Sequence, residues 1–270
     1  GDGALWSVGG KGVGVVVAID PEMTQNCHQI IIYGAKLSWN GGSMRAFLRI
    51  FSFGISLFLF PACTLADDAQ HWEVLSVTAG THDGWRFLGE NITRTSQSRG
   101  FYELEQNLMV GHTLDFAGVK GVTVWLGYTH DPNYSHADFS VMEHRFRQQV
   151  NIDRLAKVGP VTVSGRLRME ERWREGQAGM GWRLRPFVKG TLPVGGPFAL
   201  VAAHESFLDL TRTTFQRPAG EDRMRNFAGF DLRMSRHLLL ELGYLNQHGF
   251  VSGGADTSDN IASLELRAGF

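Results

Sequence analysis

The sequence predicts an all-β fold, an antiparallel up-and-down transmembrane β-barrel of about 10–12 strands around a charged lumen. Three observations predict it. Polarity alternates with a period of two along most of the chain, the connections alternate in length, and the last strand ends in an aromatic residue. With 270 residues, 33 glycines and a formal net charge of −1, the chain suits one large β domain.

The clearest alternation lies at residues 161–173. The even positions carry polar or charged side chains: Thr162, Ser164, Arg166, Arg168, Glu170 and Arg172. The odd positions are apolar or glycine apart from Glu171, and they end in Trp173. A period of two places the two sets on opposite faces of one strand. A membrane barrel turns the apolar face to lipid and the charged face to the lumen. A soluble β-sandwich, the alternative, buries the apolar face.

Ten further segments show the same alternation, each followed by a turn: 72–80, 85–94, 101–113, 121–130, 140–153, 181–192, 198–210, 225–234, 237–247 and 261–270. In the third of them, Tyr102, Leu104 and Leu108 share an apolar face opposite Glu103 and Glu105. The count is therefore eleven, whereas single-chain bacterial barrels usually have an even number of strands. Because strand boundaries are the least reliable part of such a prediction, we expect ten to twelve.

The polar faces gather the side chains that we predict to line the lumen: Glu143, Arg145, Gln149, Arg166, Arg168, Glu170, Arg183, Arg185, Glu205, Arg233, Glu241 and Gln247. Buried charges must pair or stay hydrated, because an isolated one costs several kcal/mol. The set is therefore either a structural lattice that fills the barrel or the lining of a narrow pore for small polar solutes. Arginines suit carboxylate or phosphate groups, although the mixed signs argue against strong anion selectivity.

The connections differ in length at the two ends of the predicted barrel. Those near 116–120, 155–159, 193–196 and 235–236 are short, and those at 130–138, 211–222 and 250–260 are longer and polar. Outer-membrane barrels have short periplasmic turns and long outer loops. Trp173, Trp182 and Tyr244 lie toward the long-loop ends of apolar faces, where an interfacial girdle is expected. Long loops also leave open a third function class, a binding module that uses residues 211–222 or 250–260.

The amino-terminal part of the sequence predicts export. Residues 44–66 have a basic start with Arg45 and Arg49, an apolar stretch and small residues before Ala66, as in a Sec signal peptide. We expect residues 1–43 to be spurious upstream translation and residues 67–270 to be the mature barrel domain, located in the bacterial outer membrane. Cys27 and Cys63 precede the expected cleavage site, so the barrel has no disulfide and no thiolate metal site.

The last strand carries the most specific local signal. Ala262, Leu264, Leu266, Ala268 and terminal Phe270 share one face. This arrangement resembles the carboxy-terminal signal that the outer-membrane barrel assembly machinery recognises. That machinery is therefore an expected partner, along with outer-membrane lipid and lipopolysaccharide.

Several segments together resemble a known family. They are EHRFRQQV at 143–150, RLRMEERW at 166–173, WRLRPF at 182–187, HESFLDL at 204–210 and RNFAGFDLRMSRHLLLELGYLNQ at 225–247. Their order is similar to that in domain of unknown function 2490, a family exported by Gram-negative bacteria, and the likeness covers nearly all of 71–270. It implies an outer-membrane β-barrel and no particular activity.

A His-x-Ser pair offers an alternative function. His204 and Ser206 share the predicted lipid-facing side of one strand, and such a pair resembles the active site of outer-membrane lipid A deacylases. The alternative is thus a lipid-modifying hydrolase, in which the imidazole activates the serine hydroxyl. A third group must orient the imidazole. The neighbouring acids Glu205 and Asp231 face inward, so the sequence predicts no such partner.

Cofactors, metals and nucleic acid are not expected. The histidines form no H-E-x-x-H motif, and no basic tail is present. A divalent ion in the predicted loop with His130, Asp131 and His136 is the remaining metal hypothesis, against the simpler interpretation that these are solvated loop residues. The sequence gives no indication of the oligomeric state.

Overall fold

The computed structural model describes residues 68–116, 119–216 and 219–270. The predicted signal peptide at 44–66 and the segment 1–43 lie outside these residues. The regular structure is entirely β, in eleven strands: β1 (Asp68–Gly80), β2 (Trp85–Ser96), β3 (Gly100–Phe116), β4 (Val119–Ser135), β5 (Asp138–Val158), β6 (Val161–Arg174), β7 (Gly181–Gly195), β8 (Phe198–Asp209), β9 (Gly220–Arg233), β10 (Leu238–Gly249) and β11 (Thr257–Gly269). Among the described residues, no helix is long and apolar enough to cross a membrane.

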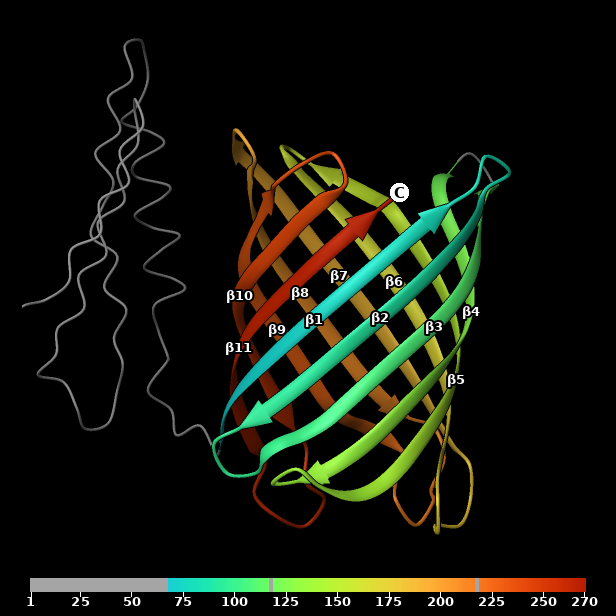
Figure 1. Cartoon of the computed structure of the whole chain (residues 1–270), viewed down its shortest axis with the longest axis vertical. Coiled ribbons are helices and arrows are strands. Elements are labelled where there is room, and N and C mark those ends of the chain that lie inside the picture. Colours follow the sequence, from blue (N-terminus) through green and yellow to red (C-terminus); the bar gives the residue numbers. More distant parts are fainter. Residues whose placement is uncertain (1–67, 117–118, 217–218) are drawn as a thin grey trace, which may run out of the picture. The chain divides into compact units, whose positions relative to one another are not determined.

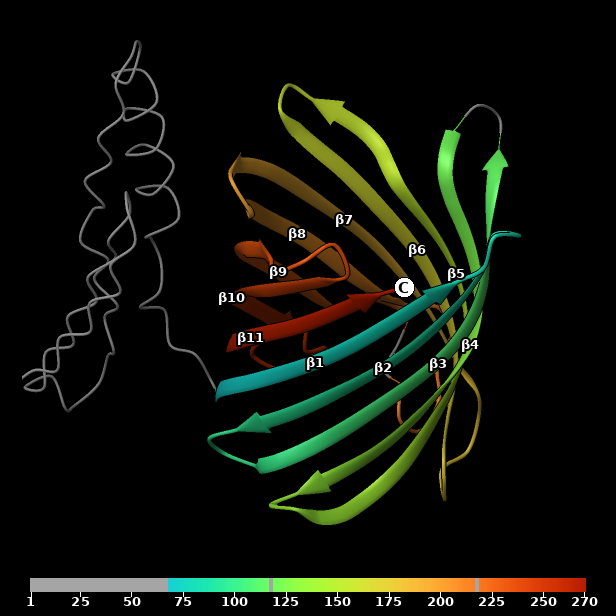
Figure 2. The same ribbon diagram turned by 45° about the horizontal axis from the view of Figure 1, so that its top comes forward.

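The strands form one closed barrel in which each strand pairs with its neighbours in sequence, and β1 pairs with β11 (Figure 1). The predicted barrel of ten to twelve strands is confirmed, and the β-sandwich is excluded. Ten of the pairings are antiparallel, but β1 and β11 are parallel, with Trp72 beside Ser263. The odd strand number requires this, because the first and eleventh strands of an up-and-down order run in the same direction. Figure 2 shows these two strands side by side.

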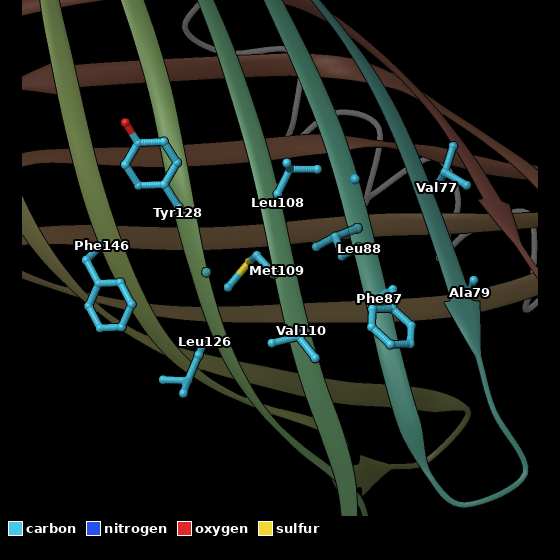
Figure 3. A pocket seen from close by; sticks show the side chains of 12 residues that line it. Val77, Ala79, Phe87, Leu88, Leu108, Met109, Val110, Leu126, Tyr128 and Phe146 are labelled. Atoms are coloured by element: carbon cyan, nitrogen blue, oxygen red, sulfur yellow. The ribbon is translucent and has the colours of Figure 1, made fainter.

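Apolar side chains cover the outer wall. Leu108 on β3 is 70% exposed, and Phe87 on β2 and Leu126 on β4 are about half exposed. Figure 3 shows these side chains with Val77, Tyr128 and Phe146 around a shallow hollow on neighbouring strands. The inner faces carry the buried polar and charged groups. The wall is therefore largely apolar outside and largely polar and charged inside.

The turns at the carboxy-terminal end of the barrel are short, and we call this end the short-turn end. The opposite, loop end has longer connections at 175–180, 210–219 and 250–256. One predicted loop is wrong. Residues 130–138 continue β4 and β5 and close in a tight turn at His136 and Ala137, whose φ angles are 52° and 70°. Two adjacent residues with positive φ match the hairpin turn whose twist fits antiparallel strands.

A β-bulge reverses the predicted facing of Tyr102. In the β2–β3 pairing, Arg94 is opposite Glu103 and Thr95 is opposite Phe101, so Tyr102 is the extra residue. Its ring turns inward, and its hydroxyl lies 2.6 Å from Gln70 Oε1 and 2.9 Å from Trp72 Nε1. Alternation alone placed Tyr102 on the apolar outer face because a bulge leaves no mark in the polarity pattern.

Large side chains fill the lumen toward the short-turn end. Trp125 and Met109 are buried there, and glycines on adjacent strands make room for them. A Cβ atom on Gly111 would lie 2.6 Å from the Trp125 ring, and one on Gly127 would lie 2.4 Å from Met109 Cγ. These inward-facing glycines therefore accept rings and thioethers that would otherwise not fit the barrel.

Candidate functional site

The interior contains a lattice of ion pairs at mid-height. Arg147 of β5 has no exposed surface, and it lies between Glu105 of β3 at 2.6 Å and Glu170 of β6 at 3.1 Å. Its guanidinium also donates to Asn107 Oδ1. Arg147 shares the inward parity of Arg145 and Gln149, so the alternation of this strand predicts its direction. A fully buried arginine between two carboxylates is held firmly, because each carboxylate helps to compensate the lost hydration of the guanidinium.

Glu143 is a second centre of the lattice. This buried carboxylate accepts hydrogen bonds from Arg145 at 2.6 Å, Arg172 at 2.9 Å and Arg174 at 2.5 Å. Arg145 also pairs with Asp131 and Glu105. Three cations around one carboxylate compensate its loss of hydration and fix the relative positions of β5 and β6.

The lattice continues across β6, β7 and β8. Arg185 contacts Glu170 at 2.7 Å and Glu205 at 3.0 Å, and Glu205 also pairs with Arg166. Arg168 donates to Gln149 Oε1 at 2.5 Å, and Arg183 pairs with Asp209 at 2.5 Å. The structure therefore joins most of the predicted lumen residues into one connected network.

A separate cluster lies nearer the short-turn end. Lys189 of β7 pairs with Glu241 and lies 3.7 Å from Asp231. Arg267 of β11 contacts Glu241 at 2.9 Å and Glu265 at 2.7 Å. Glu241 is the predicted residue here, whereas Lys189 and Arg267 were not in the predicted set. Each cation of this cluster bridges two carboxylates.

Arg233 is a predicted lumen residue that lies outside both networks. It is the last residue of β9 and is exposed. No side-chain ion pair involves it in the part of the chain that the structure describes. It shares the parity of the inward residue Asp231, but its position at the end of the strand leaves it exposed.

The lumen opens into a chamber at the loop end. This chamber has a volume of about 320 Å³ and is lined by nine arginines and four carboxylates. The arginines are Arg94, Arg99, Arg145, Arg172, Arg174, Arg183, Arg185, Arg223 and Arg225, and the carboxylates are Glu103, Glu105, Glu170 and Asp259. Acids behind the wall, such as Glu143 and Asp209, neutralise several of the arginines. The others leave the chamber with positive charge.

Arg225 of β9 is the clearest of these uncompensated cations. Its guanidinium lies between two rings, 4.5 Å from the Trp72 centroid and 4.6 Å from the Phe207 centroid. Its Nε donates to Gln247 Oε1 at 2.9 Å. No carboxylate within ion-pair distance is found for it among the described residues. Two rings and an amide thus hold the group in place, while its terminal nitrogens stay available as a bidentate donor.

Two further arginines of the chamber have weak compensation. Arg99 stacks on Tyr102 at 3.8 Å and has no ion pair within the described ranges. Arg223 has one carboxylate contact, with its neighbour Asp222 at 3.7 Å. Arg223 and Arg225 share parity with the inward residue Asp231, so extending the alternation toward the start of β9 would have found both. Arg99 lies in a turn, and no periodicity predicts its direction.

The metal hypothesis for the 130–138 segment is not supported. Asp131 is fully buried inside the barrel and pairs with Arg145, whereas His136 lies at the hairpin tip. Asp131 does lie near Glu103 and Glu105, with ligand oxygens within 4.8 Å of one another. Arg94 and Arg145 already pair with these three acids. Two guanidinium groups at the same oxygens disfavour a cation there.

The His204–Ser206 pair lies on the outer face of β8 as predicted, but the prediction that it has no third partner is wrong. His204 Nε2 lies 3.1 Å from Ser206 Oγ, and His204 Nδ1 lies 2.8 Å from Asn226 Oδ1. Asn226 is directly opposite His204 in the β8–β9 pairing. The sequence prediction considered only carboxylates as the third group, whereas the structure has an amide on the adjacent strand.

Two comparisons with known proteins identify relatives of this chain. The model of the family "Protein of unknown function (DUF2490)" matches residues 69–258, and the chain belongs to this family. The chain is also similar to an uncharacterised protein of Methylorubrum extorquens, with 30% identity over 148 residues. That match covers 54% of this chain and 64% of the relative, which is less than two thirds of the relative's length.

Proposed function

We propose that this chain is a bacterial outer-membrane β-barrel whose lumen is closed by its own side chains and whose loop-end chamber binds a small anion. The expected ligand carries carboxylate or phosphate groups. The proposal develops the structural alternative of the sequence prediction, in which the charged set fills the barrel instead of lining an open pore.

The outer wall supports the membrane location. Its apolar belt would be unfavourable in water over so large a contiguous area. At the loop end, Trp173 packs against His144 with ring centroids 5.6 Å apart, and Tyr128 lies beside both. Such amphipathic rings favour the interface between lipid and water. At the other end, Phe270 is 71% exposed and stacks on His237, which leaves its ring accessible to an assembly factor.

The observation that best supports an anionic ligand is the guanidinium of Arg225, which has no carboxylate within ion-pair distance among the described residues. Most arginines of the mid-height lattice lie close to a carboxylate, as Arg147 and Arg185 do. A cation that is held by rings and an amide, without an anion, is a preorganised donor for one. Arg99 and Arg223 add positive charge to the same chamber. The chamber volume of about 320 Å³ is large enough for a phosphate or a small polycarboxylate.

The membrane part is tested by expressing the chain in a Gram-negative host and separating its membranes. We expect the protein in the outer-membrane fraction, with a gel mobility that changes on boiling, as folded barrels show. Deletion of Phe270 should lower the folded amount. Recovery of folded, heat-modifiable protein in the soluble fraction would refute the location.

The ligand part is tested by calorimetric titration of the folded protein in detergent with inorganic phosphate and with citrate at low salt. We expect Arg225→Gln to weaken binding by about 10- to 100-fold, the value of one bidentate charged contact. Arg225→Lys keeps the positive charge but loses the two parallel N–H donors of the guanidinium. Its affinity should therefore lie between those of the unaltered protein and of Arg225→Gln. Arg267→Gln, at the short-turn end, is the matched control. Absence of binding, or equal losses in both variants, would refute the anion site.

A further inference from the structure

A chain of three polar side chains crosses the outer wall between β8 and β9. Ser206, His204 and Asn226 are joined by contacts of 3.1 Å and 2.8 Å. Their surroundings are otherwise apolar, with Val188 opposite His204 on β7 and Leu208 beyond Ser206 on β8. Polar groups on such a surface are costly unless they bond to one another, so a reason for their presence is required.

The contacts fix the tautomer of the imidazole. Asn226 Oδ1 can only accept a hydrogen bond, so His204 Nδ1 carries the proton. The Nε2 atom of the neutral ring is then a free acceptor, and Ser206 Oγ donates to it. This is the arrangement of a nucleophile, a general base and an orienting group, and an amide serves as the third member in papain-like proteases.

We propose that Ser206, His204 and Asn226 form a catalytic triad that hydrolyses long-chain acyl esters of membrane lipid. The inference rests on the proposed membrane location, because the triad then faces lipid. It adds an activity on the outer wall that is independent of the anion chamber inside.

A groove beside the triad supplies a place for the acyl chain. It has a volume of about 440 Å³, and Ser206 and His204 border it. Apolar residues of β5, β6 and β7 make up most of the rest, among them Val150, Ile152, Leu155, Leu167 and Val188. Gly165 keeps the groove open, because a Cβ atom there would lie 3.2 Å from Leu155 Cδ2. An extended hydrocarbon chain fits such a lining better than a polar substrate does.

A row of amides continues from the triad around the wall. Asn226 is opposite Asn246 of β10, and Asn246 is opposite Asn260 of β11. Asn246 Nδ2 donates to Ser258 Oγ at 3.0 Å, and the Tyr244 hydroxyl donates to Asn260 Oδ1 at 2.5 Å. This outward polar row marks a level at which the wall suits ester and headgroup atoms instead of hydrocarbon. An ester bond at that level lies within reach of Ser206.

The strand ladder is interrupted beside the nucleophile. The β7–β8 register places Pro186 opposite Ser206, yet no pairing joins Arg185 and Pro186 to Ser206 and Phe207. Proline lacks the N–H that a ladder requires.

The reaction balances with water as the only co-reactant. Ser206 Oγ attacks the acyl carbon while His204 Nε2 takes the hydroxyl proton. The C–O bond to the lipid alcohol then breaks, and His204 returns the proton to that leaving oxygen, which leaves an acyl ester on Ser206. Water attacks the ester with His204 again as base, the Oγ–acyl bond breaks, and the proton returns to Oγ. The products are a lyso-lipid and a fatty acid.

Covalent capture tests the nucleophile directly. A fluorophosphonate forms an Oγ–P bond with an activated serine and releases fluoride. In detergent, the folded full chain should be labelled at Ser206, as identified by peptide mass spectrometry. Ser206→Ala should remove the label, and His204→Ala should slow it by roughly 1,000-fold or more. His144→Ala is the matched control, because His144 also lies on the outer wall and bonds to another hydroxyl, that of Tyr128.

Asn226 is tested as a positioning residue. Asn226→Leu should slow labelling by about 10- to 100-fold, and Asn226→Asp, which keeps the acceptor oxygen, should restore most of the rate. Heat-modifiable gel mobility verifies folding for each variant and is independent of the activity. An unlabelled Ser206 in folded protein, or labelling unaffected by His204→Ala, would overturn the triad.

Substrate hydrolysis is measured as fatty acid release from phosphatidylethanolamine vesicles and, separately, from lipopolysaccharide in detergent. We expect release from at least one, and its loss in Ser206→Ala. The responding substrate identifies the source of the ester. Release from neither by protein that does carry the label would overturn the assignment to membrane lipid.

Discussion

The two ends of the lumen balance their charges differently. Near the short-turn end, Lys189 and Arg267 are each shared between two carboxylates, so two cations face Asp231, Glu241 and Glu265. At the loop end, nine arginines line the chamber against four carboxylates. Glu205 is opposite Arg225 in the β8–β9 pairing, but no carboxylate of the described residues lies within ion-pair distance of Arg225. The first arrangement has more carboxylates than cations, and both of its cations are fully paired. The second arrangement has more cations than carboxylates in its lining.

This difference distinguishes two roles of the charged side chains in the barrel interior. Some hold neighbouring strands in position, and others are available to bind a ligand. Ion pairs that satisfy each other hold neighbouring strands in position and have nothing left to bind. A guanidinium fixed between Trp72 and Phe207 keeps its terminal donors free at little entropic cost. Composition alone does not distinguish these roles, because both ends contain arginine and glutamate. The two roles are distinguished by whether each charged group has an oppositely charged partner.

The largest effect is expected where the lattice is most connected. Glu143→Ala leaves three arginines around an empty site, and it should destabilise the barrel by about 3–5 kcal/mol, as the loss of one partner of a buried ion pair does. Urea unfolding in lipid vesicles, followed by gel mobility, measures it. Glu265→Ala, at the less buried end, is the control and should cost less. Equal losses would remove the distinction between the two ends.

Replacing the chamber arginines that have weak carboxylate pairing should lower the stability of the barrel little and weaken ligand binding strongly. The double variant Arg223→Gln with Arg225→Gln should keep the folded barrel and weaken phosphate binding by at least about 100-fold. Calorimetry and urea unfolding of the same samples separate the two quantities. A large loss of stability with unchanged binding would show that these arginines belong to the supporting lattice.

A gain of affinity is expected when the chamber loses a negative charge. Asp259 lines it and accepts a hydrogen bond from Gln247 Nε2 at 3.2 Å. Asp259→Asn preserves the shape and removes the charge, so phosphate should bind about 2- to 10-fold more tightly. The same titration measures it at two salt concentrations, and the gain should shrink at high salt. Weaker binding in Asp259→Asn would contradict a cationic site.

The smallest effect concerns pH at the 250–256 loop. The backbone N–H of Val251 donates to Asp256 at 2.9 Å and His248 lies 3.2 Å away, and these contacts lower the pKa of Asp256 from its ordinary 3.8. A lowered folded-state pKa stabilises the loop above the ordinary value, and this contribution disappears as pH falls through the lowered one. Pepsin cleavage at this loop should therefore accelerate toward pH 2. In Asp256→Asn the loop should be cleaved readily at pH 4 as well.

Polarity alternation predicted the strands well because most strands carry apolar side chains on the outer face of the barrel and polar or charged ones on the inner face. It placed Glu143, Arg168, Glu170 and Glu205 correctly inside. It failed at Tyr102, where a bulge adds one residue, and at 130–138, where two strands continue through a polar stretch into a tight turn. Neither event changes the local composition.

The candidate sites were harder to predict than the fold. Whether Arg225 has a carboxylate within ion-pair distance depends on how the side chains around it in the lumen are paired. Asn226 contacts His204 because the β8–β9 register places the two residues opposite each other. Both are relations between strands, whereas alternation describes each strand by itself. Extending the inward parity to Arg223 and Arg225 was within reach of the sequence. The absence of a carboxylate within ion-pair distance of Arg225, among the described residues, could not be predicted in this way.

The most direct test of the closed lumen is single-channel conductance of refolded residues 67–270 in a planar bilayer. The lattice around Arg147 predicts no discrete conductance. The variant that replaces both Arg147 and Glu170 with alanine empties the middle layer, so it should conduct and thereby verify insertion. Discrete steps from the unaltered, heat-modifiable protein would contradict closure and make the arginine and glutamate network the wall of an open pore.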